Sequence, residues 1–387
     1  MKILQIHNEY YFKGGEDTVV NLEFNLLKKK NIVHQLIRKN LNEIKNLKDK
    51  LNVVKNITNS QISKKIINAY LDKYKPRIVH IHNIFPLWTG SLIAELSKRN
   101  IPIVMTLHNY RFFCSNGMFF RNNKICTKCI SGSLFNGVKY KCYQNSYIKS
   151  LAVYSYLTSI RKNKILDKID KFIVFTKFSK DIYSKIIDKN KIIIKPNFTT
   201  KIKTNINIKK KNKFFLFVGR ISSEKGIDLI INNLNRFKIN IKIIGDGPLL
   251  DRLKLIKSNK IQFLGKLTKQ KTIAYMKKAE CLLFTSKWYE GMPMVILEAM
   301  SVGLPIVSSR LGNMKYIIKN NINGLFFNIN LKYDLSKKAN YLYKNKIFKK
   351  LLKKNSINVY KKKYSSSTNY IILKNIYQQV LKEKLKN

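Results

Sequence analysis

The sequence is poor in acidic residues and in cysteine, and it has no long apolar run. Only 21 aspartates and glutamates stand against 76 lysines and arginines, so the formal net charge at pH 7 is +55. No stretch reaches the roughly 18 apolar residues that span a bilayer, which excludes a transmembrane helix. The apolar run after Met1 is too short for a signal peptide, so we expect a cytoplasmic protein. Because the cytoplasm is reducing, the five cysteines are not expected to form a disulfide framework.

The charge has two interpretations. It can attract the protein to nucleic acid or to an anionic membrane surface. It can also reflect a general bias toward lysine, asparagine and isoleucine, which we favour because the basic residues are dispersed along the chain. No nucleic-acid recognition motif or concentrated basic stripe is visible, so no specific nucleic-acid partner is expected. Some attraction to an anionic membrane would still follow.

Strands and helices alternate in two halves, which predicts an α/β fold of two doubly wound, Rossmann-like domains. A length of 387 residues with 45% hydrophobic side chains suits two globular domains. Ser179 is expected to cap a helix, and residues 338–364 are expected to be helical. The predicted segments are an N-terminal domain (1–197, with a cysteine insert at 112–145), a linker (198–213), a C-terminal domain (214–365) and a final helix (366–387).

Two glutamates, Glu290 and Glu298, stand eight positions apart in the most informative stretch of the chain. Glycine and proline follow Glu290 at 291 and 293, so Glu290 should lie on a loop. From Met294 the residues favour a helix, which should carry Glu298 near its start. The loop and the helix dipole would offer N–H groups to an anion, with two carboxylates beside it. A polyhydroxylated ligand that carries phosphate fits both features.

A second motif is Gly219-Arg220, followed by Lys225-Gly226. A strand over 214–218 places Arg220 at the rim of the sheet, and Gly226 permits a helix to begin. Arginine suits bidentate contacts with phosphate and lysine acts as a point charge, so both can stabilise a departing diphosphate. A solvated Arg–Lys pair is the alternative in so basic a chain.

Glycines and histidines follow strands in the first half. Gly14 and Gly15 lie between a strand and a helix, either as a phosphate cradle or as a tight turn. His82 and His108 end two consecutive predicted strands, and ligands gather at the carboxyl ends of parallel strands. One such histidine alone is more often structural, but two at the same rim favour a site.

Four cysteines cluster within the insert at Cys114, Cys126, Cys129 and Cys142. The Cys-x2-Cys spacing with two flanking cysteines suits a structural, tetrahedral zinc ion that closes an irregular loop. Four buried or free thiols fit equally well, whereas a redox role is disfavoured because no thioredoxin-like context surrounds the pair.

Basic and aromatic residues interleave between Gly137 and Lys164. This segment is either a surface that faces anionic lipid or a solvated helix face with its tyrosines packed inward, and we lean to the second. The residues are Lys139, Tyr140, Lys141, Tyr143, Tyr147, Lys149, Tyr154, Tyr156, Arg161 and Lys162.

The motifs together resemble one family over nearly the whole chain, apart from the cysteine insert. The carboxylate pair with Gly303-Leu-Pro305 after it, the G-R-x4-K-G stretch and the Gly245-x-Gly247-Pro248 turn resemble the retaining, nucleotide-sugar-dependent glycosyltransferases of family 4, also called group 1. In the four-cysteine insert the chain resembles a bacterial subset of this family. The resemblance implies the GT-B fold, in which two domains face a cleft and the final helix returns to the first domain.

The resemblance also implies roles for single residues. Arg220 and Lys225 would hold the diphosphate, Glu298 the ribose and Glu290 the sugar hydroxyls. The catalytic residues would be Glu290, His108, Arg220 and Lys225, and His108 would contact the sugar. Further donor contacts would come from Gly14, Gly15, Gly247 and Leu264, and from the backbone N–H groups of Gly291, Met292, Pro293 and Met294.

The implied activity is transfer of a sugar from a nucleoside-diphosphate sugar, with retention, to a lipid-linked or cell-surface polysaccharide acceptor at the inner membrane face. Acceptors of the lipopolysaccharide, capsule or exopolysaccharide type are expected. No catalytic cofactor is expected, because no Asp-x-Asp metal motif lies near the donor residues. One alternative is a GT-B nucleotide-sugar epimerase, which the paired motifs disfavour. The other is a basic nucleic-acid-binding or membrane-binding protein without catalysis.

Overall fold

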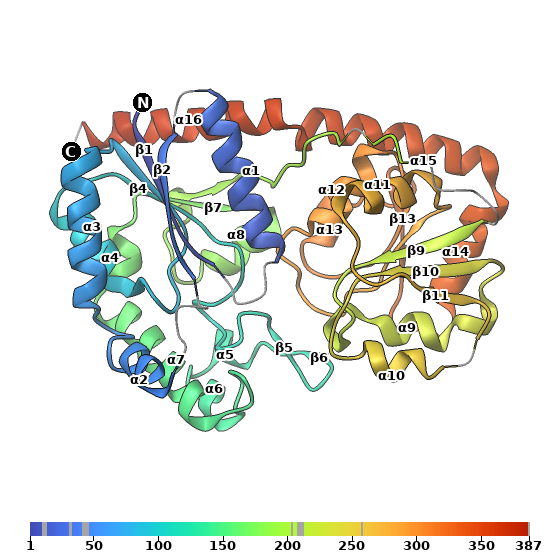
Figure 1. Cartoon of the computed structure of the whole chain (residues 1–387), viewed down its shortest axis with the longest axis horizontal. Helices are drawn as coiled ribbons and strands as arrows, with labels where there is room; N and C mark the ends of the chain where they lie inside the picture. Colours follow the sequence, from blue (N-terminus) through green and yellow to red (C-terminus); the bar gives the residue numbers. More distant parts are fainter. Residues whose placement is uncertain are drawn as a thin grey trace. The chain divides into compact units, whose positions relative to one another are not determined.

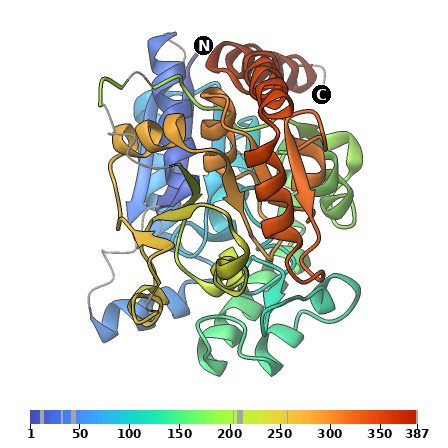
Figure 2. The same cartoon turned by 90° about the vertical axis from the view of Figure 1, so that its right-hand side faces the viewer.

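The computed structural model describes residues 1–9, 14–30, 33–40, 46–202, 204–206, 213–256 and 258–385. It divides into two compact units, each with its own parallel sheet (Figures 1 and 2). Unit 1 comprises Met1–Phe119, Cys126–Pro196 and Asn369–Asn387; unit 2 comprises Phe120–Ile125 and Asn197–Thr368. The predicted α/β class with two doubly wound sheets is confirmed.

The sheet of unit 1 has the strand order β2-β1-β3-β4-β7-β8. Its strands are β1 (Ile3–Glu9), β2 (Val33–Asn40), β3 (Ile78–Asn83), β4 (Ile103–Thr106), β7 (Lys171–Val174) and β8 (Ile192–Ile194). The apolar runs of β1 and β3 are buried along their whole length, as expected for central strands of a parallel sheet. The order reverses between β1 and β3, the kind of switch point at which ligands bind in such sheets.

Helices of unit 1 are α1 (Gly15–Lys29), α2 (Leu47–Lys55), α3 (Gln61–Tyr74), α4 (Thr89–Lys98), α5 (Lys128–Ser131), α6 (Asn136–Lys139), α7 (Tyr147–Lys162) and α8 (Lys177–Tyr183). The expectation that Ser179 caps a helix is wrong. The N-cap of α8 is Thr176, whose extended backbone precedes the helix, and Ser179 lies buried within the helix.

The final helix, α16 (Ser366–Lys384), packs its apolar residues into the core of unit 1. Leu373 and Tyr377 are fully buried there beside Ile3 and Ile78 of the sheet. The helix begins after Ser365, whose hydroxyl accepts the N–H of Thr368 at 3.3 Å. The contacts of this helix explain why residues from Asn369 onward group with the N-terminal part of the chain.

The sheet of unit 2 has the order β11-β10-β9-β12-β13-β14, which reverses between β9 and β12. Its strands are β9 (Phe214–Val218), β10 (Asn240–Ile244), β11 (Ile261–Phe263), β12 (Leu282–Phe284), β13 (Ile306–Ser309) and β14 (Gly324–Phe327). A short hairpin is formed by β5 (Phe120–Arg121) and β6 (Lys124–Ile125). The core of the unit gathers large apolar residues from the sheet, including Phe215, Ile241 and Val307.

Helices of unit 2 are α9 (Ile227–Asn232), α10 (Leu250–Lys254), α11 (Lys269–Lys278), α12 (Met294–Ser301), α13 (Met314–Ile317), α14 (Asp334–Lys344) and α15 (Lys346–Val359). The prediction of a continuous helix over 338–364 is wrong at Asn345, which has a non-helical backbone. Its side chain accepts the N–H of Phe348 at 2.9 Å, so it ends α14 and caps α15. Tyr360–Tyr364 then forms a π-helical turn.

The predicted linker starts within packed structure. Phe198 and Thr199 are buried in unit 2, and the N–H of Thr199 donates to the carbonyl of Tyr364 at 3.2 Å. Residues 203 and 207–212 of that linker lie outside the described residues. In the described ranges no helix is both long enough and apolar enough to cross a membrane.

Candidate active site

In unit 2 the structure joins two of the predicted site residues, Lys225 and Glu290. Lys225 ends a 3-10 turn after β9, and Glu290 lies on the loop between β12 and α12, as expected. The Lys225 ammonium lies 2.6 Å from Oε1 of Glu290. The hydroxyl of Ser286 donates to the same carboxylate oxygen, and the glutamate is buried. A buried carboxylate therefore fixes a cation that remains about one-quarter exposed.

The backbone around this pair is cross-linked. Gly226 has a φ of +68°, and a Cβ there would lie 2.0 Å from the carbonyl oxygen of Thr285. The hydroxyl of Thr285 donates to the carbonyl of Lys225 at 2.8 Å, and the amide of Asn313 donates to the carbonyl of Glu290 at 2.7 Å. Glycine is needed at 226 because two backbones meet there.

Arg220 follows β9 at the carboxyl edge of the sheet, where its side chain is exposed. Its turn is held by the N–H of Ile221, which donates to the carbonyl of Asp246 at 2.8 Å. A Cβ at Gly245 would lie 1.8 Å from the carbonyl oxygen of Gly219, so the two turns touch through glycine. Within the described part of the chain the guanidinium has no hydrogen bond or ion pair, so its donors are available to a phosphate.

The loop before α12 offers three of the four predicted N–H donors. Pro293 is the N-cap of α12 and has no N–H, so the expectation of a donor from it is corrected. The N–H groups of Gly291, Met292 and Met294 have no protein acceptor among the residues that the structure describes. Asn197 holds this loop, because its amide donates to the carbonyl of Met292 at 3.2 Å. Free N–H groups at a helix start suit an anion.

Glu298 lies on α12 and is buried, and it forms an ion pair with Lys269 at the start of α11. Sequence reasoning missed Lys269, because one lysine among so many carries no local signal. Trp288 was missed as well: its ring lies beneath the Lys225 ammonium, 5.4 Å from its centroid. The indole N–H of Trp288 is buried without a partner among the described residues.

The turns after β10 and β11 use part of their backbone polar groups internally. The N–H of Leu264 donates to the carbonyl of Ile243 at 2.8 Å, and the N–H of Gly245 donates to the carbonyl of Gly265 at 2.9 Å. The N–H of Gly247 donates to the side chain of Asp246 at 2.7 Å. Among described residues, the carbonyl of Leu264 and the N–H of Gly265 have no backbone partner.

In unit 1 the glycine pair forms the start of α1. The N–H of Gly14 donates to Oδ2 of Asp17 at 2.7 Å, and Oδ1 of Asp17 lies 2.9 Å from Nε2 of His7. Among the described residues, which do not include 10–13, nothing lies within 4 Å of the place where a Cβ of Gly15 would be. The packing of the described residues therefore does not require glycine at position 15.

The two predicted histidines of unit 1 are brought together. Nδ1 of His82 lies 3.1 Å from Nε2 of His108, at the carboxyl ends of β3 and β4. Burial lowers the pKa of His82 to about 3 and holds the pKa of His108 well below its ordinary value, so both rings are neutral at pH 7. His108 is only partly buried, and its ring also packs on Phe175.

The predicted cysteine set is not drawn into a tetrahedral site. Among the described residues, which include all four cysteines, the group of three potential ligands with donor atoms within 4.8 Å of one another is Glu23, His80 and His82. Burial and the neighbouring thiols of Cys114, Cys142 and Cys126 raise the pKa of Cys129 to about 12. The thiol of Cys114 donates to Asn116 at 3.0 Å.

The interleaved segment 137–164 mixes the two expected arrangements. Tyr156 packs inward on α7 and is 1% exposed, as in a solvated helix with buried tyrosines. On the same helix Tyr147, Ile148 and Leu151 are 55%, 77% and 49% exposed. Apolar side chains therefore project from α7 among the lysines, as an interfacial surface requires.

Gly14, Gly15 and His108 thus belong to unit 1, and the remaining predicted donor residues belong to unit 2. Apart from Glu298 on α12, these residues lie in the turns, loops and helix starts that follow the carboxyl ends of strands. Lys225 and Glu290 meet where β9 and β12 adjoin, at the switch point of the unit 2 sheet.

Two family models and several known proteins match the chain. Residues 198–361 match the model of the family Glycosyl transferases group 1, and residues 52–199 match that of Glycosyltransferase Family 4. The chain is 26% identical over 271 residues to an uncharacterized glycosyltransferase of Methanocaldococcus jannaschii, a match that covers 67% of this chain and 65% of the relative. The chain is 24% identical over 298 residues to the Escherichia coli UDP-Gal:alpha-D-GlcNAc-diphosphoundecaprenol alpha-1,3-galactosyltransferase (71% of this chain, 69% of the relative).

Solved structures share the fold over the whole chain. Sucrose-phosphate synthase of Thermosynechococcus elongatus has a TM-score of 0.72 at 15% identity and covers 99% of both chains. Anabaena HepE, solved in complex with UDP, has a TM-score of 0.68 at 14% identity and covers 98% of this chain and 100% of its own. The predicted GT-B fold is confirmed. The chain belongs to the group 1 family of GT-B glycosyltransferases.

Proposed function

We propose that this protein transfers a hexose from a nucleoside-diphosphate sugar, with retention of anomeric configuration, to a lipid-linked acceptor of surface-polysaccharide synthesis. The observation that carries the proposal is the buried Glu290 carboxylate that holds the Lys225 ammonium at 2.6 Å. On the same loop the N–H groups of Gly291, Met292 and Met294 have no acceptor among the described residues. This pairs a cation for the diphosphate with a carboxylate for sugar hydroxyls. Arg220, exposed and without a protein partner among described residues, adds a second cation.

The relatives support the donor and acceptor classes. HepE was solved with UDP and with UDP-glucose. The Escherichia coli relative is named for transfer of galactose from UDP-Gal to a diphosphoundecaprenol-linked sugar. The relative from Acholeplasma laidlawii, 26% identical over 275 residues, is named alpha-monoglucosyldiacylglycerol synthase. Lipid acceptors would bring the enzyme to the inner face of the cytoplasmic membrane, where the exposed apolar residues of α7 would meet the surface.

The proposed step needs no enzymic nucleophile. The bond between C1 of the sugar and the diphosphate oxygen breaks, and the acceptor hydroxyl oxygen bonds to C1 on the same face. Its proton passes to an oxygen of the departing diphosphate. Arg220 and Lys225 would stabilise the negative charge that develops there, while His108 would contact the sugar. Glu298 would accept hydrogen bonds from the ribose hydroxyls, either after Lys269 moves aside or while Lys269 keeps one of the carboxylate oxygens.

A thermal-shift screen against UDP-, GDP-, ADP- and dTDP-sugars tests the proposal. A ligand at a hundredfold excess over its Kd stabilises the folded state by about 2.7 kcal/mol, which raises Tm by several degrees. One nucleotide class should do so in the wild type and fail in Glu298→Gln. The matched control is Glu280→Gln, which alters another buried glutamate–lysine pair of unit 2, with Lys349. No shift with any sugar nucleotide would contradict the proposed donor.

A further inference from the structure

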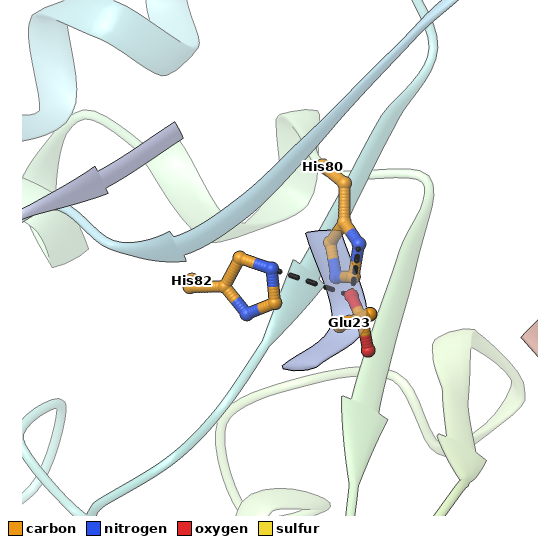
Figure 3. A group of neighbouring side chains, drawn as sticks. All are labelled: Glu23, His80 and His82. Atoms are coloured by element: carbon orange, nitrogen blue, oxygen red, sulfur yellow. Dashed lines mark ion pairs between the residues drawn. The ribbon is translucent and has the colours of Figure 1, made fainter. Parts of the chain in front are cut away.

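Four side chains of unit 1 contact one another in sequence, in the order Lys195, Glu23, His82 and His108. Nζ of Lys195 lies 3.0 Å from Oε2 of Glu23, and Oε1 of Glu23 lies 3.4 Å from Nε2 of His82. Nδ1 of His82 then lies 3.1 Å from Nε2 of His108. Figure 3 shows the Glu23 carboxylate between the rings of His80 and His82. Lys195, Glu23 and His82 are 1%, 1% and 3% exposed.

The cluster is not suited to a metal ion, although Glu23, His80 and His82 have donor atoms within 4.8 Å of one another. The charge of Glu23 is already matched by the Lys195 ammonium, which would repel a cation. Both nitrogens of His80 are in use, with Nδ1 at 2.7 Å from the hydroxyl of Tyr377 and Nε2 at 2.8 Å from that of Thr106. The same contacts tie α1, β3 and α16 together.

The contacts determine which ring nitrogens carry protons. The Glu23 carboxylate is ionised: burial opposes its charge, but Lys195 and His80 hold its pKa well below the ordinary value. A bare Nε2 on His82 would place two lone pairs 3.4 Å apart, so Nε2 carries the proton and donates to Glu23. The amide of Gln5 lies 3.4 Å from the same nitrogen, but it donates to Glu23 at the shorter distance of 3.0 Å.

The proton on His82 fixes the state of His108. A neutral ring has one N–H, so Nδ1 of His82 is an acceptor and Nε2 of His108 must donate to it. Nδ1 of His108 is then a bare acceptor on a partly exposed ring, and no described residue of the protein hydrogen-bonds to it.

We propose that Glu23 and His82 are positioning residues that keep His108 protonated on Nε2, so that its Nδ1 accepts a hydroxyl proton of the bound sugar. This inference rests on the proposed function for the identity of the ligand. The assignment gives the buried charges of unit 1 a role in recognition, because a carboxylate two residues removed from the ligand decides whether His108 accepts or donates. A sugar that lacks the matching hydroxyl would lose this contact.

The tautomer can be observed directly. The chain has five histidines, so selective 15N labelling and long-range 1H–15N correlation resolve the state of each ring. In the ligand-free wild type at pH 7 we expect His108 to carry its proton on Nε2. In Glu23→Met combined with Lys195→Met, which removes the acceptor of the His82 Nε2–H and leaves no unpaired buried ammonium, His108 should shift toward protonation on Nδ1. Thr106→Val, which removes a partner of His80 outside these four side chains, should leave His108 unchanged.

Calorimetric titration with UDP and with UDP-glucose completes the test. If the thermal-shift screen selects another base, the nucleoside diphosphate of that base and its sugar derivative are used instead. The double variant should bind UDP like the wild type but bind the sugar nucleotide about tenfold more weakly, since only the latter presents sugar hydroxyls. An Nδ1-protonated His108 in the wild type, an unchanged tautomer in the variant, or equal weakening for both ligands would overturn the inference. If the wild type binds neither ligand while the tautomers behave as expected, the proposed function fails and the recognition role fails with it.

Discussion

The ammonium of Lys225 lies 2.6 Å from the carboxylate of Glu290, although the two residues are 65 positions apart in the chain. The pair forms because the turn after β9 and the loop after β12 meet at the switch point of the sheet. An ammonium has three donors, so one bond to Glu290 leaves others for a ligand. The Glu290 carboxylate thus positions the ammonium of Lys225, and the contact between Gly226 and Thr285 positions its backbone.

That backbone contact gives a first prediction. Gly226 and Gly265 have almost the same φ, +68° and +67°. A Cβ at 226 would overlap the carbonyl oxygen of Thr285, whereas one at 265 would have no described residue within 4 Å. Gly265→Ala should cost about 1 kcal/mol for the left-handed backbone alone. Gly226→Ala should cost about 3 kcal/mol or more and weaken nucleotide binding. Urea denaturation of both variants measures this, and equal costs would show that the close contact is absent.

The buried histidine of unit 1 predicts a pH dependence of stability. The folded pKa of His82 is about 3, below the 6.5 of the unfolded chain, so the unfolded state binds more protons in this window. The free energy of unfolding should therefore fall as pH falls from about 6.5 toward 3, by about 2 kcal/mol at pH 5 from His82 alone. The lowered pKa of Glu23 acts in the same direction at lower pH.

Urea denaturation between pH 8 and pH 5 measures this effect. In His82→Gln the slope of the free energy of unfolding against pH should correspond to about one proton fewer taken up on unfolding. The variant is expected to be less stable than the wild type at every pH. An unchanged slope would show that His82 titrates normally in the folded protein.

The four cysteines still carry the zinc prediction. Zinc would keep thiolates ionised that are otherwise protonated, as the raised pKa of Cys129 indicates for the metal-free state. We expect one equivalent of zinc by atomic spectroscopy and a lower Tm after chelation, with both lost in Cys126→Ser/Cys129→Ser. Cys281→Ser is the control, because Cys281 is buried in the core of unit 2. Protein purified without chelator that holds no zinc would contradict the prediction.

The exposed side chains of α7 predict binding to anionic membranes. Ile148→Glu with Leu151→Glu should reduce pelleting with vesicles that contain anionic lipid by about tenfold or more, since burying each side chain contributes about 1.5–3 kcal/mol. Charge reversal at Lys139, Lys141 and Lys149 should weaken it further. Ile347→Glu is the control, because this residue of unit 2 is 86% exposed. Unchanged pelleting of the α7 variants would exclude this surface.

Much of the fold could be predicted because parallel strands are short, buried apolar runs with local turn signals. The strands β3, β4 and β9 were each predicted, and so was the loop position of Glu290, although β4 ends at Thr106 and not at His108. Ends of helices were less certain: Thr176 and not Ser179 precedes α8, since several polar residues there can start a helix.

The partners of the site residues could not be predicted. Glu23 and Lys269 contact Lys195 and Glu298, which are distant from them in the sequence, and no local spacing connects them. A chain with 76 basic residues also gives no sign of which lysine meets which carboxylate. The fold makes these pairs by packing helices together and against the sheet: Glu23 lies on α1, Lys269 on α11 and Glu298 on α12.

The most direct test of the account is the affinity of the nucleoside diphosphate for an Arg220→Ala variant. Arg220 is exposed and has no protein partner among described residues, so its removal should leave the fold intact. Arg252→Ala on α10 removes another exposed arginine of the same unit. Loss of a charged hydrogen bond predicts a Kd about 10- to 100-fold higher for Arg220→Ala and an unchanged Kd for Arg252→Ala. Equal affinity in the wild type and Arg220→Ala would contradict the assignment of the diphosphate to this edge of unit 2.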